Sequence, residues 1–209
     1  MSVKFLRRLA AAREGVAMVE FAFVAPLLLI LILGGLEVVN YALAHMRVSQ
    51  MTMTVADNAG RVPTGIDEAN IYEVFAGAEV IGAPLKFEEN GRLILSSVQD
   101  NKQKGNAKGQ VIHWQRCWGE LKIDPAYGDE GKGRNDNSLK NGVGRPGKRI
   151  GALEGTAVMF VEATYEYQPL IVGGYISPPD ITYESAFNVR GRQNQDISNA
   201  QSLDVLDCD

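Results

Sequence analysis

The most constraining feature of the sequence is the apolar run Val16–Leu36, which contains a single charged residue, Glu20. At about 1.5 Å per residue, a helix of this length spans roughly 30 Å, the thickness of the hydrocarbon core of a bilayer. A lone segment that crosses lipid has to be helical, because only a helix satisfies its own backbone hydrogen bonds. The run therefore predicts one membrane helix at 16–36. Since a charge within the bilayer is costly, Glu20 is a candidate functional residue.

The charges before the run predict its orientation. One acid, Glu14, stands among four basic residues, Lys4, Arg7, Arg8 and Arg13. The positive-inside rule then keeps the N-terminus in the cytoplasm and places the C-terminal part on the far side of the membrane. Without residues 1–15 the chain loses four basic residues and one acid, so the formal charge changes from -4 to -7. An acidic exported part argues against nucleic acid as a partner.

Helical periodicity continues beyond the membrane run. Apolar residues recur at steps of three, four and seven, which predicts one stripe of an amphipathic helix that packs on a soluble domain. We expect the helix to end near Asn58 or Ala59, with Gly60 as its C-terminal cap and Pro63 preventing continuation. The stripe consists of Leu36, Val39, Leu43, Met46 and Met53.

The remaining sequence predicts an α+β domain over residues 61–209. A short helix is expected from an N-cap at Thr64 to about Gly82. Asn90-Gly91 then predicts a hairpin between 85–88 and 92–98. Further strands are expected at 110–118, 156–168 and 181–189, which gives an antiparallel sheet backed by the long helix. The polar stretch of about 119–155 is expected to be a mobile loop between two strands.

A second pattern lies where the apolar run begins. Cleavage after Gly15 would create a new amine at Val16, four residues and one helical turn before Glu20. The amine and the carboxylate could then neutralise each other, within one chain or between neighbouring subunits. Such a pair would remove much of the cost of placing Glu20 in apolar surroundings.

These residues carry a resemblance to a known family. Basic residues, then Arg13-Glu14-Gly15, Val16–Val19, Glu20-Phe21 and the run Ala22–Leu36 are similar to the type IV prepilin-like proteins. Within that class the chain resembles the TadE-like pseudopilins of the tight-adherence, or Flp-type, pilus system. The motif covers roughly residues 7–41.

The resemblance implies a minor pseudopilin with a pilin-like fold that acts in pilus assembly, and through it in adhesion and surface colonisation, rather than in catalysis. It implies a leader peptide at 1–15, removed by a prepilin peptidase after Gly15, and a mature helix at 16–60 in which Glu20 and Phe21 support assembly. The implied partners are the prepilin peptidase, other pilins and pseudopilins, the inner-membrane assembly machinery and membrane lipid. The protein would lie in the inner membrane with its domain in the periplasm, or in the pilus after assembly.

Two other interpretations of the N-terminus remain open. The run could be an uncleaved signal anchor, with Glu20 reaching the interface, that holds a periplasmic enzyme or sensor domain. Alternatively, Ala42-Leu43-Ala44 offers a small-x-small site for an ordinary signal peptidase, although the apolar run is long for a secretory signal.

The other candidate motifs are weak. Gly142–Lys148 imitates a phosphate-binding loop, but Arg149 replaces the Ser or Thr that would hold magnesium. His113 and Cys117 lack a second pair that would complete a metal site, so we expect no metal and no cofactor. The exported compartment permits a disulfide between Cys117 and Cys208, although spacing alone also allows two separate thiols.

Overall fold

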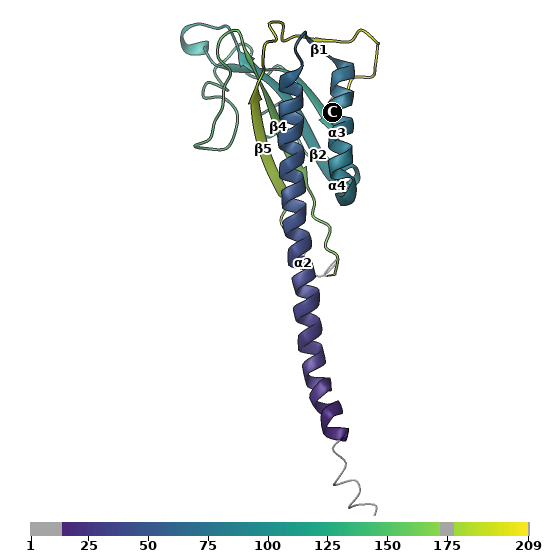
Figure 1. Ribbon diagram of the computed structural model, residues 1–209. Coiled ribbons are helices and arrows are strands. Elements are labelled where there is room, and N and C mark those ends of the chain that lie inside the picture. The colour runs from purple at the N-terminus through teal and green to yellow at the C-terminus, as the bar shows by residue number, and fades with distance from the viewer. Residues whose placement is uncertain (1–13, 172–177, 209) are drawn as a thin grey trace, which may run out of the picture.

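The computed structural model describes residues 14–171 and 178–208 (Figure 1). Most of the expected leader peptide therefore lies outside the described residues. A long N-terminal helix stands free over its first half and packs over its second half on an antiparallel sheet, which confirms the expected α+β fold. In chain order the elements are α2 (Glu14–Arg61), β1 (Ile66–Asp67), α3 (Glu68–Gly82), η1 (Ala83–Leu85), α4 (Phe87–Asn90), β2 (Gly91–Asp100), η2 (Gly105–Ala107), β3 (Gln110–Trp118), β4 (Ala157–Tyr165), β5 (Ile181–Asn188) and β6 (Ile197–Ser198).

Helix α2 joins the two halves of the molecule without a break. It has 48 residues and includes Pro26, which lies within the apolar run. The helix continues through Gly60, which does not adopt the left-handed conformation expected of a cap. A Cβ on Gly60 would lie 3.2 Å from the carbonyl oxygen of Asn188, so the residue instead allows β5 to approach the helix closely.

Small and medium-sized side chains form the face of α2 that packs on the domain. This face is buried against β4, β5 and α3. Alanine and valine allow the helix axis to lie close to the sheet, and larger Met51 fills the space beside Gly82 of α3. The buried residues of this face are Ala44, Val48, Met51, Val55, Ala56 and Ala59.

The apolar stripe that was predicted to pack on the domain is exposed, so that prediction is wrong. Leu43 is 45% exposed, Met46 58% and Met53 45%. At about 100° per residue, this stripe lies roughly 180° around the helix from the buried face. Both faces of α2 are apolar, and periodicity alone does not show which of them meets the sheet.

The sheet has the strand order β3-β2-β4-β5, and each neighbouring pair is antiparallel. Its inner face packs on α2 and α3 through residues such as Leu95, Met159 and Val161. Its outer face is covered by the 119–156 segment between β3 and β4, because Leu139, Val143 and Ala152 of that segment join a second apolar cluster there. The sheet is therefore buried on both faces at its centre.

Two local predictions before β2 are wrong. Helix α3 begins at Glu68 instead of near Thr64, because Asp67 and Asn70 form a reciprocal capping box. The hairpin at Asn90-Gly91 does not form, since residues 83–90 make two short helical turns. Phe87 explains the difference: it is fully buried and stacks on Trp118 and Tyr165, which a strand at 85–88 would prevent.

The C-terminal tail returns across the domain. Strand β6 pairs in parallel with β1, and Leu206 packs against the main core. Cys117 and Cys208 form a disulfide with their Cα atoms 5.0 Å apart. Arg92 donates hydrogen bonds to the carbonyl oxygens of Gly119 and Cys208, at 2.8 Å and 2.9 Å, and so holds the same end of the tail.

Met51 and Met53 provide a matched test of the two helix faces. We expect Met51→Ala to lower the free energy of unfolding by about 2–5 kcal/mol, because it opens a cavity in the core. Met53→Ala is expected to change it by no more than about 0.5 kcal/mol, because the side chain is partly in solvent. Denaturant unfolding of the full chain in detergent measures both, and equal losses would contradict the assignment of the faces.

Candidate functional site

The four residues of the processing and assembly motif lie in the first two turns of α2. Gly15, Val16, Glu20 and Phe21 are all exposed, and a Cβ on Gly15 would contact nothing within 4 Å. The continuous helix places Val16 and Glu20 one turn apart on one face. No packing within the domain accounts for these residues.

The helix that starts at Gly15 is long and apolar enough to cross a membrane, and none of its most apolar window is buried in the protein. Seven apolar residues of this exposed part are consecutive, from Leu27 to Leu33. A folded domain that left such a surface in water would be unstable toward association. The chain thus has one N-terminal helix suited to a single-pass membrane anchor.

A polar cluster fixes the domain to α2 where the apolar run ends. The carboxylate of Glu37 accepts hydrogen bonds from the Tyr167 hydroxyl at 2.6 Å and from the Ile171 backbone N–H at 3.0 Å. Asn40 donates to the same tyrosine hydroxyl at 2.7 Å. Burial has the largest effect on the pKa of Tyr167 and the hydrogen bond to Glu37 the next largest, and together they raise it to about 12. The phenol therefore remains a neutral donor at ordinary pH.

Aromatic side chains extend this contact along the helix. Tyr41 meets both His45 and Tyr167 edge to face, with ring centroids 4.5 Å and 5.0 Å apart. His45 contacts Tyr183 of β5, where the Nδ1 atom lies 3.1 Å from the hydroxyl. Sequence analysis missed this cluster, although Glu37, Tyr41 and His45 recur at a four-residue spacing that places them along one side of a helix.

A buried ion pair joins the sheet to α3. The Nε atom of Arg116 on β3 donates to both carboxylate oxygens of Glu68, at 2.9 Å and 3.0 Å, and both side chains are almost fully buried. Burial lowers the pKa of Arg116, but the hydrogen bond and charge of Glu68 outweigh it and the net shift is upward. Glu130, which lies in the 119–156 segment that covers the outer face of the sheet, places its carboxylate 3.2 Å from the Nη1 atom of Arg116. Removing one member would leave an uncompensated charge in the core, so the cluster has a structural role.

Two glutamates of the sheet hold the 119–156 segment on its outer face. Glu162 and Glu184 are directly opposite each other on β4 and β5. Glu162 accepts from the Ala126 backbone N–H at 3.0 Å, and Glu184 accepts from the Tyr127 hydroxyl at 2.6 Å. Glu184 also accepts from the Arg145 backbone N–H at 3.2 Å. Burial, with a smaller contribution from Glu184, raises the pKa of Glu162 to about 7 against the lowering effect of its hydrogen bond.

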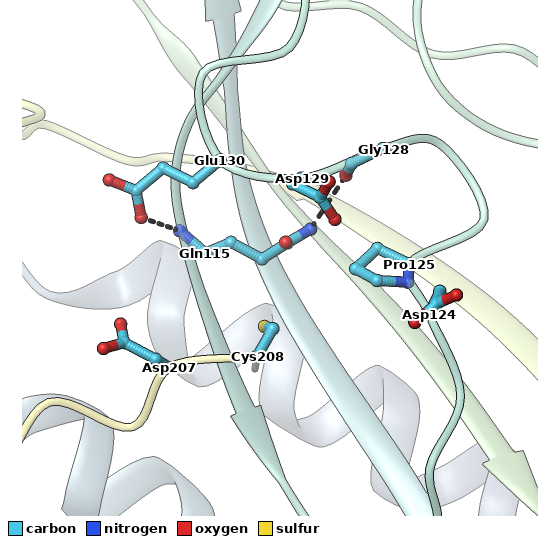
Figure 2. Close-up of a pocket in the computed structure, with 8 residues that line it drawn as sticks. All are labelled: Gln115, Asp124, Pro125, Gly128, Asp129, Glu130, Asp207 and Cys208. Atoms are coloured by element: carbon cyan, nitrogen blue, oxygen red, sulfur yellow. Dashed lines mark hydrogen bonds between the residues drawn. The ribbon is translucent and has the colours of Figure 1, made fainter.

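A hollow of about 820 Å³ lies between the 124–130 segment and the C-terminal tail (Figure 2). Gln115 of β3 crosses it; its backbone N–H donates to the Glu130 carboxylate at 3.0 Å, and its side-chain amide donates to the Gly128 carbonyl oxygen at 3.4 Å. The lining carries four carboxylates, those of Asp124, Asp129, Glu130 and Asp207, and no histidine, lysine, serine or free thiol. It is lined by Gln115, Asp124, Pro125, Gly128, Asp129, Glu130, Asp207 and Cys208.

The weak motifs of the sequence have structural explanations. Val143 and Ile150 pair through two backbone hydrogen bonds of 2.9 Å and 2.7 Å, so the 142–148 segment is a tight turn with neither a strand before it nor a helix after it. His113 contacts Asp196 at 2.7 Å, and Cys117 is bonded to Cys208. Among residues 14–171 and 178–208, no group of three or more His, Cys, Asp or Glu side chains is arranged to hold a metal ion.

Comparison with known proteins supports the sequence resemblance. Residues 15–57 match the model of the TadE-like protein family, which confirms the expected similarity. The matched segment is almost the whole of α2, including both the exposed apolar run and the part that packs on the sheet. Searches of curated proteins and of solved structures found no match.

The raised pKa of Glu162 predicts a pH-dependent stability. A carboxyl group whose pKa rises from 4.5 to about 7 on folding contributes stability that is complete below pH 4.5 and is lost as the pH rises to about 7. Glu162→Gln should therefore flatten the decline in unfolding free energy across this window. Denaturant unfolding at a series of pH values measures it, with Glu154→Gln as the control, because Glu154 is exposed and lies outside β4. A decline that persists unchanged in Glu162→Gln would contradict the assignment.

Proposed function

We propose that this chain, whose long helix matches the TadE-like family, is a minor pseudopilin required for assembly of a tight-adherence, or Flp-type, pilus. Through the pilus it would serve adhesion and surface colonisation. Its role is structural, since it supplies a helix and a domain to an assembly and catalyses no reaction. Its partners are other pilins and pseudopilins and the inner-membrane assembly machinery.

One observation carries the proposal: the exposed apolar surface of α2 continues far beyond the length that a bilayer needs. Glu37 is the first charged residue after the apolar run, and Met53 lies sixteen residues later. At about 1.5 Å per residue, the exposed stripe thus extends roughly 24 Å past the end of the run. Lipid would cover the apolar run at residues 16–36 before assembly, but the part of the stripe beyond Glu37 requires a protein partner.

A neighbouring pilin helix fits this surface best. The stripe faces away from the chain's own domain, so a second helix can approach without meeting the sheet. Leu43, Met46 and Met53 offer side chains that interdigitate with the grooves of another helix. In the assembled fibre, the apolar run and the stripe would then form one continuous contact with adjacent subunits.

The N-terminal motif supports processing before assembly. A membrane prepilin peptidase would remove residues 1–15 after Gly15, leaving a mature helix at 16–60 and an exported domain at 61–209. The new amine at Val16 would pair with Glu20 of the same or a neighbouring chain and set the register of the helices. Phe21, which the fold leaves exposed, would pack against a neighbouring subunit.

The basic residues before the helix support an orientation with the N-terminus in the cytoplasm and the domain in the periplasm. Inner-membrane lipid would surround residues 16–36 until the subunit enters the fibre. A signal-anchored enzyme or sensor is less well supported, because residues 15–57 match the model of the TadE-like family.

The mature N-terminus tests this proposal most directly. We expect the protein purified from cells that contain their own prepilin peptidase to begin at Val16, because the motif is cut after Gly15. Intact mass measurement and N-terminal sequencing determine the start. A chain that begins at Met1 would indicate a signal anchor, and a chain that begins at His45 would indicate secretory cleavage; either result would falsify the pseudopilin proposal.

Assembly itself should depend on both ends of the exposed surface. We expect Met46→Lys and Glu20→Ala to impair piliation while leaving membrane insertion intact, because each disrupts contact between helices and neither lies in the core. Val80→Lys provides a matched control, since Val80 is an exposed apolar residue on α3. Pilus recovery in the sheared fraction is measured beside carbonate extraction of the membranes. Normal piliation of the Met46→Lys strain would exclude a role for the stripe.

A further inference from the structure

The chain leaving β4 runs along α2 toward the free half of the helix (Figure 1). Its last residues before the undescribed stretch 172–177, Gln168–Ile171, reach the level of Glu37. The contact is specific, because the Ile171 N–H donates to the Glu37 carboxylate at 3.0 Å and the Tyr167 hydroxyl donates to the same group at 2.6 Å. The segment is thus held at a fixed height on the helix.

This height corresponds to the outer surface of the bilayer. Seventeen residues separate Glu20 from Glu37, which is roughly 26 Å along a helix at about 1.5 Å per residue. The hydrocarbon core is about 30 Å thick, so a helix with Glu20 near the cytoplasmic side has Glu37 close to the opposite interface. Backbone tied to Glu37 lies at the same depth.

The segment at this depth has the chemistry of an interfacial contact. Leu170 is 68% exposed and Ile171 41% exposed, although both are large and apolar. The sequence from Tyr167 to Ile171 contains no charged residue. Its polar backbone is partly satisfied by Glu37, which lowers the cost of bringing it near lipid.

Exposed apolar residues of α2 lie at the same height. Val38 follows Glu37 directly and is exposed, as are Leu36 and Val39 further around the helix. Membrane that covers these helix residues would reach Leu170 as well. A neighbouring subunit is the alternative occupant, but the exposed stripe that suits a second helix lies on the side of α2 opposite the domain.

We propose that Leu170 and Ile171 form a second membrane contact, in which the end of the β4 connection dips into the acyl-chain and headgroup boundary beside α2. The inference rests on the proposed function only in requiring that α2 spans a bilayer. Together, the helix and this contact fix the tilt and the height of the exported domain above the membrane. Glu37 is the positioning residue, since it joins the two.

Tryptophan quenching by brominated lipid tests the contact on the full chain. The Leu170→Trp variant is reconstituted in phosphatidylcholine vesicles whose acyl chains carry bromine near the carbonyl end. Emission of the unmutated protein, which contains Trp114 and Trp118, is subtracted. Leu31→Trp within the apolar run reports insertion of the helix, and Leu153→Trp, an exposed site on the covering segment, reports a position in water.

We expect the Leu170→Trp variant to lose emission in brominated relative to plain vesicles, while the Leu153→Trp variant keeps its emission. Equal behaviour of these two variants, with Leu31→Trp quenched, would overturn the contact and leave the anchoring of α2 unaffected. If the Leu31→Trp variant is not quenched, α2 does not span the bilayer, and both proposals are wrong. If the Leu170→Trp variant is shielded from aqueous acrylamide but not quenched by bromine, another protein copy covers the segment and the lipid contact is wrong.

Discussion

The structure depends on the packing of one face of α2 against the sheet and α3. That face is built mainly from alanine and valine, which bring the helix close enough for Met51 to fill the remaining space beside Gly82. Because the helix is continuous, this contact holds the domain rigidly to a segment that extends far beyond it. The opposite face is left without a partner in the same chain. The packing of this one face thus stabilises the domain and leaves the opposite apolar face of α2 exposed.

Polar interactions position the elements that this packing brings together. Glu37 binds the end of the β4 connection through Tyr167 and Ile171, and so sets where the domain meets the free half of the helix. Arg116 and Glu68 join β3 to α3 within the core, where each charge requires the other. The Cys117–Cys208 disulfide holds the C-terminal tail beside the same strand.

Elements that depend on interactions between nearby residues were predictable from the sequence, whereas features that depend on contacts between distant residues were not. The long helix and the strands at 110–118, 157–165 and 181–188 were predictable, because each has a strong local pattern of apolar residues. The hairpin at Asn90-Gly91 was predicted from turn chemistry, but burial of Phe87 between Trp118 and Tyr165 favours helical turns. The cap of α3 was misplaced by three residues, because Thr64 and Asp67 are both good caps and only the bond to Asn70 selects one. The four-residue spacing of Glu37, Tyr41 and His45 indicates one side of the Glu37 cluster, but its partner Tyr167 lies 130 positions away, so no local pattern could identify it.

The sequence alone determined that a membrane-length helix leads into an α+β domain, because hydrophobic length and periodicity are properties of consecutive residues. It also placed Val16 and Glu20 one helical turn apart directly after Gly15, the spacing on which the proposed processing and assembly motif rests, since helical spacing follows directly from residue number. Only the tertiary structure decided which apolar face of α2 is buried, because that choice depends on the shape of the sheet that the helix meets. It likewise decided that Glu37 holds the end of the β4 connection, since chain folding alone brings those distant groups within hydrogen-bond distance.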